Sequence, residues 1–239
     1  MTVLSAESSA KAASCAVTKD GILLGEYYLN SGFTHSKTLL PMIDQLLSTL
    51  SIPPSDIDLL AVNRGPGSFT GIRIGVAAIK GLSFSCGAKC VGVSTLDSLC
   101  YNIPSYEGLI CPVMDARVGQ VYNALFERRG GVLTRLCADR AITVKDLEEE
   151  LCALSSPFLL VGDGAGLCAG SFSQSLSGRA QLAPESLRLS RASSVAAAAV
   201  AGLGSIYEAV DGALLSCGYL RPSQAERERA AKLENKIKE

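Results

Sequence analysis

The chain has 239 residues, with 22 Lys and Arg side chains, 23 Asp and Glu side chains and a formal net charge of −1. A net charge this close to zero excludes broad electrostatic capture of nucleic acid by the chain alone. The single histidine excludes a zinc hydrolase of the type that places two imidazoles on one helix face.

The first hundred residues predict three strands followed by alternating helices and strands. Short apolar runs at 3–6, 12–17 and 22–29 are typical of an antiparallel meander, and an Asp-Gly turn separates the last two. Apolar residues at helical spacing predict one helix over 36–50, which starts near Pro41 or kinks there, and a second over 70–84. Strands are predicted at 57–62 and 90–93, and a short helix at 95–100.

A similar order of elements begins again after residue 108. Strands are predicted at 109–114, 120–126, 132–137 and 158–161, with a helix at 144–154 and a long Ala-rich helix at 190–210. Two halves with one element order indicate a structural repeat. We therefore expect an α/β fold with two domains, residues 1–103 and 104–222, each βββαβα with a mixed sheet. Residues 223–239 carry charges of both signs and predict a charged C-terminal helix or tail.

The apolar tracts and the cysteines of the sequence indicate the compartment in which the protein works. The longest apolar tract, at 195–203, is far shorter than the ~20 residues that a membrane span needs, and the N-terminus lacks a signal-peptide pattern. Nine scattered cysteines without a C-x-x-C pair are typical of buried free thiols in a reducing compartment. We therefore expect a cytoplasmic protein with no membrane contact.

A glycine-rich turn, NRGPGSFTGIRIG at 63–75, joins a predicted strand to a predicted helix. Gly65, Gly67 and Gly71 allow a backbone path that side chains would block, and the helix N-terminus, with Arg73 nearby, suits an anion. The spacing matches neither a P-loop nor a dinucleotide fingerprint. Two interpretations therefore stay open, an anion site and a tight structural turn.

Three further stretches are candidates for a phosphate or nucleotide cleft between the two halves. Glu7-Ser8-Ser9 ends the first strand, where a carboxylate could hold a metal-bound phosphate, although ordinary turn chemistry also explains the serines. Asp115 and Arg117 occupy the equivalent place in the second half and either pair within a hairpin or face the cleft. Gly162 and Gly164 belong to a loop that could lie against a nucleotide.

With these motifs in view, the sequence resembles the TsaB (YeaZ) family of bacterial tRNA threonylcarbamoyladenosine biosynthesis. The stretches that carry the resemblance are NRGPGSFTGIRIG, HSKTLLP at 35–41, VGVSTL at 91–96, DAR at 115–117 and YLRPSQAERE at 219–228. The resemblance implies two actin-like, sugar-kinase-like (ribonuclease H-like) domains and a non-catalytic paralogue of the transferase subunit TsaD. It implies no metal, cofactor or catalytic residue, because TsaD holds its metal through a histidine pair that this chain lacks. Glu7 replaces the family's usual Asp, which weakens the case for bound ATP.

The resemblance also implies partners. TsaB proteins pair with TsaD through helices of the N-terminal domain, are joined by the ATPase TsaE, form homodimers when the partner is absent, and meet tRNA only through the complex. Both predicted helices carry more apolar residues than one buried stripe needs, so one side is expected to face a partner, unless the chain itself covers both. The expected interface residues are Leu39, Leu40, Met42, Ile43, Leu46, Leu47, Ile72, Val76 and Ile79. The alternatives are an ATP-dependent transferase or kinase of the same fold, or a glycopeptidase.

Overall fold

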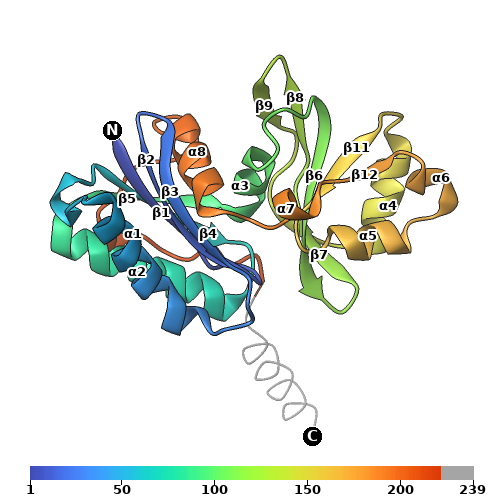
Figure 1. The fold of residues 1–239 in the computed structure, drawn as a ribbon. Helices are drawn as coiled ribbons and strands as arrows, with labels where there is room; N and C mark the ends of the chain where they lie inside the picture. The colour runs from blue at the N-terminus through green and yellow to red at the C-terminus, as the bar shows by residue number, and fades with distance from the viewer. Residues whose placement is uncertain (222–239) are drawn as a thin grey trace, which may run out of the picture.

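The computed structural model describes residues 1–221, which form two mixed sheets with helices on the faces of each. Figure 1 shows the two sheets side by side, with α3 between them. The predicted charged helix or tail at 223–239 lies outside the described residues. Within residues 1–221, no helix combines the length and the apolar character that crossing a membrane requires.

The first sheet has the strand order β3-β2-β1-β4-β5. Its strands are β1 (Thr2–Glu7), β2 (Ala13–Lys19), β3 (Ile22–Leu29), β4 (Leu59–Gly65) and β5 (Lys89–Ser94). The β1 strand pairs antiparallel with β2 and parallel with β4. Every residue of β1 is buried, because helices cover both faces of the sheet, and this explains why its sequence lacks an alternation of apolar and polar residues.

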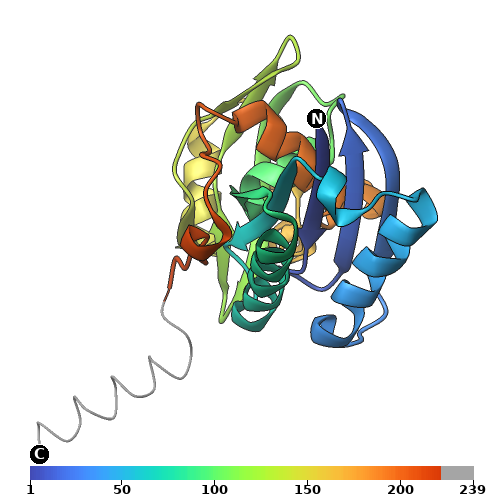
Figure 2. The ribbon, with the colours of Figure 1, turned by 90° about the vertical axis from the view of Figure 1, so that its left-hand side faces the viewer.

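Two helices cover one face of the first sheet, and a third covers the other. Figures 1 and 2 show α1 (His35–Leu50) and α2 (Phe69–Cys86) next to each other on one face. The α1 helix continues through Pro41 and buries Leu39, Ile43 and Leu46 against the sheet. The opposite face packs against α8 (Ala192–Gly202), which comes from the second half of the sequence, and the short α3 (Thr95–Tyr101) lies beside α8.

The second sheet has the order β10-β7-β6-β11-β12, with β8 and β9 attached to β6. Its strands are β6 (Gly108–Arg117), β7 (Gln120–Asn123), β8 (Phe126–Arg129), β9 (Val132–Arg135), β10 (Arg140–Thr143), β11 (Phe158–Val161) and β12 (Ala180–Leu182). The sheet curls because β6 pairs with β8 through its first half and with β7 through its second. The remaining helical segments are α4 (Val144–Ala153), α5 (Ala165–Ser171), α6 (Gln174–Ser177), α7 (Glu185–Arg188), η1 (Pro54–Asp56) and η2 (Gly212–Leu214).

The expected α/β class with two mixed sheets is confirmed. The second half departs from the expected βββαβα order, because five strands precede α4, and two element predictions there are wrong. The strand predicted at 120–126 is two strands, because the buried amide of Asn123 bonds the carbonyl oxygens of Pro112 and Ala124 where the chain passes from one part of the curled sheet to another. The helix predicted at 190–210 covers only Ala192–Gly202, because the backbone turns extended at Leu203 and the Gly202 carbonyl oxygen accepts hydrogen bonds from the amides of Ile206 and Tyr207. All nine cysteines are free and most are buried, as expected.

Candidate functional site

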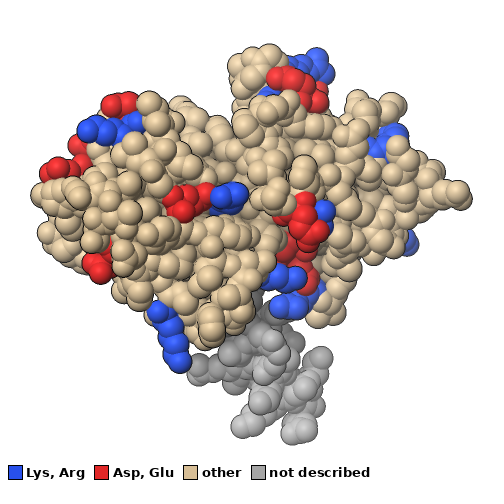
Figure 3. All heavy atoms as spheres, viewed as in Figure 1, with Lys and Arg blue, Asp and Glu red and all other residues tan. Residues whose placement is uncertain are grey.

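A cleft of about 390 Å³ lies between the two sheets. One wall is formed by the turn after β1 and the segment between β4 and α2, and the opposite wall by the end of β6 and by Asp163. Residues 218–221 close a third side. Figure 3 shows acidic and basic side chains gathered along the boundary between the two halves. Four of the residues expected at a phosphate or nucleotide cleft line it: Ser9, Gly67, Asp115 and Arg117. Ile72, which was expected at the partner interface, also lines this cleft.

Glu7 does not reach the cleft, which corrects its expected role at a phosphate site. Its carboxylate is fully buried and accepts hydrogen bonds from the Ser9 amide (2.7 Å), the Ser9 hydroxyl (2.6 Å) and the Asn63 side-chain amide. Burial raises the pKa of Glu7, and the hydrogen bonds from Ser9 and Asn63 oppose that rise. The Asn63 amide nitrogen also lies 2.8 Å from the Ser98 hydroxyl and 3.0 Å from that of Ser190. Glu7 thus belongs to an internal polar cluster that joins four segments.

The glycine-rich turn is occupied by the chain's own backbone. The Ser68 amide donates to the Ser9 carbonyl oxygen (2.7 Å), and the Ser8 hydroxyl donates to the Gly71 carbonyl oxygen (2.8 Å). A Cβ at Gly67 would overlap the Ser9 carbonyl oxygen, and a Cβ at Gly71 would overlap that of Ser8. Of the two interpretations of this motif, the geometry favours the structural turn, and the buried Ser8 is no cleft residue.

Arg73 also departs from its expected role, because it holds a returning segment of chain instead of lining the cleft. Its guanidinium carbon lies 3.7 Å from the centroid of the Phe69 ring, and its Nε donates to the Tyr219 hydroxyl (2.9 Å). The rings of Phe69 and Tyr219 stack with centroids 4.6 Å apart. Gly65 is needed here because a Cβ at that position would overlap the Gly218 carbonyl oxygen. The glycine-rich motif and the YLR motif therefore lie against each other.

The second half brings two carboxylates to the cleft. Oδ1 of Asp163 accepts a hydrogen bond from the backbone amide of Asp115 (3.1 Å), and burial raises the pKa of Asp163. A Cβ at Gly162 would overlap the Val113 carbonyl oxygen, and the Gly164 amide donates to that same oxygen (3.1 Å). These two glycines therefore pack against β6 and position Asp163, and they do not themselves line the cleft.

Basic residues lie at the mouth of the cleft. The Arg117 guanidinium is 3.7 Å from the Asp115 carboxylate, and its side chain is 84% exposed. An ion pair this exposed contributes about 0–1 kcal/mol to stability. The two alternatives expected for this hairpin, an ion pair and a position in the cleft wall, occur together, because Asp115 and Arg117 pair and also line the cleft. Lys11 and Arg221 line other parts of the wall, so the cleft contains charges of both signs.

These residues do not fit the magnesium nucleotide that an actin-like fold implies. Glu7 is enclosed and hydrogen-bonded within the protein, and the Ser8–Ser9 turn fills the space beside the glycine-rich loop. Within the part of the chain that the structure describes, no group of three or more His, Cys, Asp and Glu side chains is arranged to hold a metal ion. The carboxylate expected to hold a metal-bound phosphate therefore lies outside the cleft.

A second candidate site is the surface formed by α1 and α2. A groove of about 290 Å³ runs between them, lined by His35, Ser36, Leu39, Leu40, Ile74, Ala77 and Ala78. The Leu40 side chain beside it is 51% exposed, and Phe33, just before α1, is 69% exposed. Figure 3 shows few charged side chains over α1 and α2 on the visible face. We call this groove and its rim the α1–α2 face.

The structure corrects most of the residues expected at this interface. Each helix packs so closely on the sheet that a wide apolar stripe of it is already covered by the chain. Of the nine expected interface residues, Leu40 is exposed, Met42 is half-buried and the other seven are buried. The residues buried in the core are Leu39, Ile43, Leu46, Leu47, Ile72, Val76 and Ile79.

Sequence reasoning missed several residues that the structure brings to these sites. Asp163 lies within the glycine cluster at 162–166, and its acidic side chain was the sequence signal that could have identified it as a cleft residue. Phe69 and Tyr219 each belong to a motif, but nothing in the spacing predicts that they stack. Lys11 follows the Ser8–Ser9 turn without any local pattern that marks it as a cleft residue.

Comparison with known proteins gives a consistent result. Residues 31–227 match the family model described as TsaD, tRNA N6-adenosine threonylcarbamoyltransferase. The chain is 33% identical over 167 residues to the tRNA threonylcarbamoyladenosine biosynthesis protein TsaB of Bacillus subtilis, and this aligned region covers 70% of this chain and 73% of the relative. It is 31% identical to the TsaB protein of Escherichia coli over 69% of this chain and 72% of the relative. The solved structure of YeaZ from Pseudomonas aeruginosa superposes with a TM-score of 0.76 and 26% identity, covering 92% of this chain and 99% of that one. This likeness bears out the expected α/β architecture with two mixed sheets.

Proposed function

The chain belongs to the TsaB (YeaZ) family, within the wider TsaD family, and has a role in tRNA threonylcarbamoyladenosine biosynthesis; we propose that it acts there as a non-catalytic, activating subunit. It binds a TsaD-type transferase subunit through the α1–α2 face, and the pair recruits a TsaE-type ATPase. When the partner is absent, the chain forms a homodimer through the same face. With a net charge of −1, it meets tRNA only through the complex.

The observation that carries this proposal is the position of Leu40. Leu39 and Ile43 already fill the contact between α1 and the sheet, so Leu40 lies outside the stripe that the fold itself needs. It borders a groove whose other side is formed by Ile74 and Ala77 of α2. Packing this face against an equivalent pair of helices makes a four-helix contact, and interfaces of ordinary size bury about 1,600 Å² in total.

The geometry of the cleft supports the non-catalytic part of the proposal. The one carboxylate expected to hold a metal-bound phosphate is buried and hydrogen-bonded to Ser9 and Asn63. We also propose that the chain divides into two domains near residues 103 and 104. In that division α8 crosses back to cover the first sheet, so the N-terminal domain depends on the second half for part of its core.

Binding measurements with a charged substitution test the partner face. Leu40→Asp places a carboxylate on the α1–α2 face, and we expect its affinity for the purified TsaD-type subunit to fall by about 100-fold or more, because the buried charge has no partner. Leu167→Asp is the matched control, since Leu167 is 43% exposed on α5, in the other half of the molecule. Equal affinity of Leu40→Asp and the control, with both folded by circular dichroism, would reject the proposed interface.

The alternatives predict different results with the same protein. An ATP-dependent transferase or kinase binds Mg-ATP in the cleft, and calorimetry on the isolated chain measures this directly. A glycopeptidase cleaves glycopeptides in the absence of the other subunits. Micromolar nucleotide binding that is lost in the Asp115→Asn variant, or peptide cleavage by the chain alone, would contradict the non-catalytic role.

A further inference from the structure

The short helix α3 lies at the junction of the two sheets and carries polar groups that belong to neither candidate site. Six of its seven residues are buried, among them the charged Asp97. The helix begins at Ser94, whose hydroxyl accepts hydrogen bonds from the amides of Leu96 (3.2 Å) and Asp97 (3.4 Å). A carboxylate in the first turn of a helix is stabilised by the helix dipole, but burial of that charge still requires a partner.

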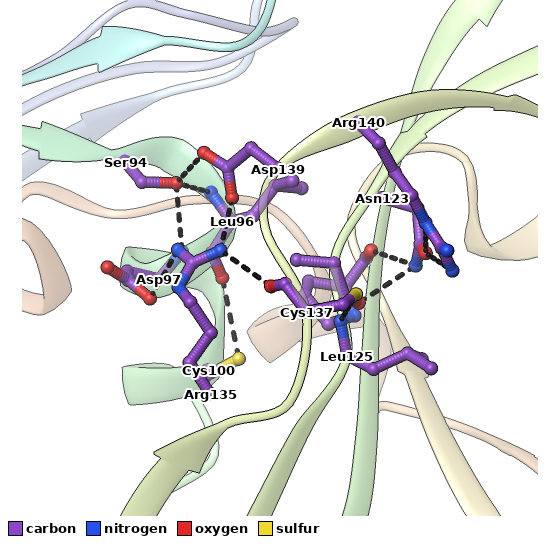
Figure 4. Close-up of polar contacts among 12 residues, drawn as sticks. Ser94, Leu96, Asp97, Cys100, Asn123, Leu125, Arg135, Cys137, Asp139 and Arg140 are labelled. Atoms are coloured by element: carbon purple, nitrogen blue, oxygen red, sulfur yellow. Dashed lines mark hydrogen bonds and ion pairs between the residues drawn. The ribbon is translucent and has the colours of Figure 1, made fainter.

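Arg135 of β9 is that partner. Its guanidinium donates to Asp97 (2.9 Å) and to Asp139 (2.6 Å), so it lies between two carboxylates, as Figure 4 shows. The hydroxyl of Ser94 donates to the second oxygen of Asp139 (2.6 Å), which closes a ring of contacts. The guanidinium also lies 4.6 Å above the ring of Phe126. Asp97 is thereby bonded to β9, and Ser94 to the connection between β9 and β10.

A third segment joins the same group. The hydroxyl of Tyr207, which follows α8, donates to Asp97 and accepts a hydrogen bond from the Ser94 amide (3.3 Å). The ring of Tyr207 packs against Gly202. Asp97 is therefore bonded both to the β8–β9 hairpin of the second sheet and to the segment that returns to the first sheet. Its side chain is only 8% exposed, and that of Arg135 is 29% exposed.

We infer that Asp97, Arg135 and Tyr207 form a clamp that fixes the two sheets relative to each other and so sets the width of the cleft. None of these three residues lines the cleft. Removal of Arg135 leaves the buried Asp97 without its counter-charge, and removal of Asp97 or of the Tyr207 hydroxyl breaks a buried contact between two of the three segments. This inference is independent of the partner face, because α1 and α2 contribute no side chain to the contacts described.

Hydrogen exchange measured by mass spectrometry tests the clamp. Asp97→Asn keeps the shape of the side chain and removes its charge. We expect amide exchange about ten-fold or more faster in β8–β9, in α3 and at residues 203–210, with no change in α1, β1 and β4, because only the junction opens. Arg129→Gln is the matched control, because Arg129 lies in the same hairpin and its pair with Glu127 is exposed, with the arginine side chain 82% accessible. That control is expected to exchange like the unaltered chain.

Tyr207→Phe is the second variant, since it retains the ring against Gly202 and loses only the hydroxyl. We expect faster exchange in α3 and at 203–210 in this variant, and a smaller effect in β8–β9. Small-angle scattering of both variants is expected to give a larger radius of gyration than the control. Exchange in Asp97→Asn that equals the Arg129→Gln control would overturn the clamp. A uniform rise in amide exchange across both sheets would also overturn the clamp, because such a rise indicates a general loss of stability and not a specific opening of the junction.

Discussion

Gly71→Ala tests the close fit of the glycine-rich turn against the Ser8–Ser9 backbone, because helix propensity and packing predict opposite signs for the change in stability. Gly71 lies in the first turn of α2, where alanine favours the helix by up to about 1 kcal/mol. A Cβ at this position overlaps the Ser8 carbonyl oxygen and lies 3.2 Å from the Ser8 carbonyl carbon and 3.3 Å from the Ser68 Cβ. The overlapping atom belongs to the Ser8 backbone, so a side-chain rotation cannot relieve the overlap.

The size of the effect follows from the contacts that must shift. Forced overpacking costs about 1–3 kcal/mol, and the two hydrogen bonds that hold the Ser8–Ser9 turn, Ser68 to Ser9 and Ser8 to Gly71, contribute about 1 kcal/mol each. After the gain in helix propensity, we expect a net loss of about 2–4 kcal/mol, or about 4–16 °C in Tm for a chain of this length.

The assay is urea and thermal unfolding of the variant beside a matched control. Gly81 lies in the same helix, and among the described residues no atom approaches within 4 Å of a Cβ placed there. Gly81→Ala is therefore expected to stabilise the chain by about 0.5–1 kcal/mol. If Gly71→Ala is as stable as the unaltered chain, or gains what Gly81→Ala gains, the proposed fit between this turn and the Ser8–Ser9 backbone is wrong.

Two further predictions concern the hairpin at the cleft mouth and the buried carboxylate. Val118 forms a two-residue turn with Gly119; it is β-branched, 93% exposed and has φ +55°. Because asparagine adopts this left-handed conformation more easily than valine, Val118→Asn is expected to raise the free energy of unfolding in urea by about 1 kcal/mol. A loss of stability in this variant would refute the strain assigned to Val118. Burial raises the folded-state pKa of Glu7 above that of the unfolded chain, so its contribution to stability is fully present below about pH 4.3 and falls as pH rises through the folded pKa. Unfolding midpoints measured from pH 4 upward should therefore fall less steeply for Glu7→Gln, and parallel slopes would show that Glu7 does not have this raised pKa.

The first half of the fold was largely predictable because its elements obey local rules. Apolar spacing placed α1 and α2, and Asp-Gly placed the turn between β2 and β3. The second half was less predictable. Only two residues separate β7 from β8, and the buried Asn123 is the last residue of β7. The Gly202 carbonyl oxygen at the end of α8 accepts hydrogen bonds from the amides of Ile206 and Tyr207, which are contacts of the folded chain.

The candidate sites show the same limit. Local sequence marks Asp115 and Gly67 as turn residues of possible importance, and both line the cleft. It gives no sign that Glu7 is enclosed by Asn63 from another strand, because burial of a carboxylate is decided by tertiary contacts. The same holds for the partner face. A helix with apolar residues on two sides is visible in the sequence, but the width of sheet that it covers is not. Ile43 and Leu46 were therefore expected on the partner face, although both are buried and Leu40 is exposed there.

Reconstituted tRNA modification is the most direct test of the non-catalytic role. A double variant, Asp115→Asn with Asp163→Asn, removes both carboxylates from the cleft and leaves the α1–α2 face unchanged. Combined with purified TsaD-type and TsaE-type subunits, this variant is expected to support threonylcarbamoyl transfer to tRNA at the rate of the unaltered chain, while each subunit alone gives none. A large loss of rate in the double variant, with binding to the TsaD-type subunit intact, would contradict the account, because it would place chemistry in this chain's own cleft.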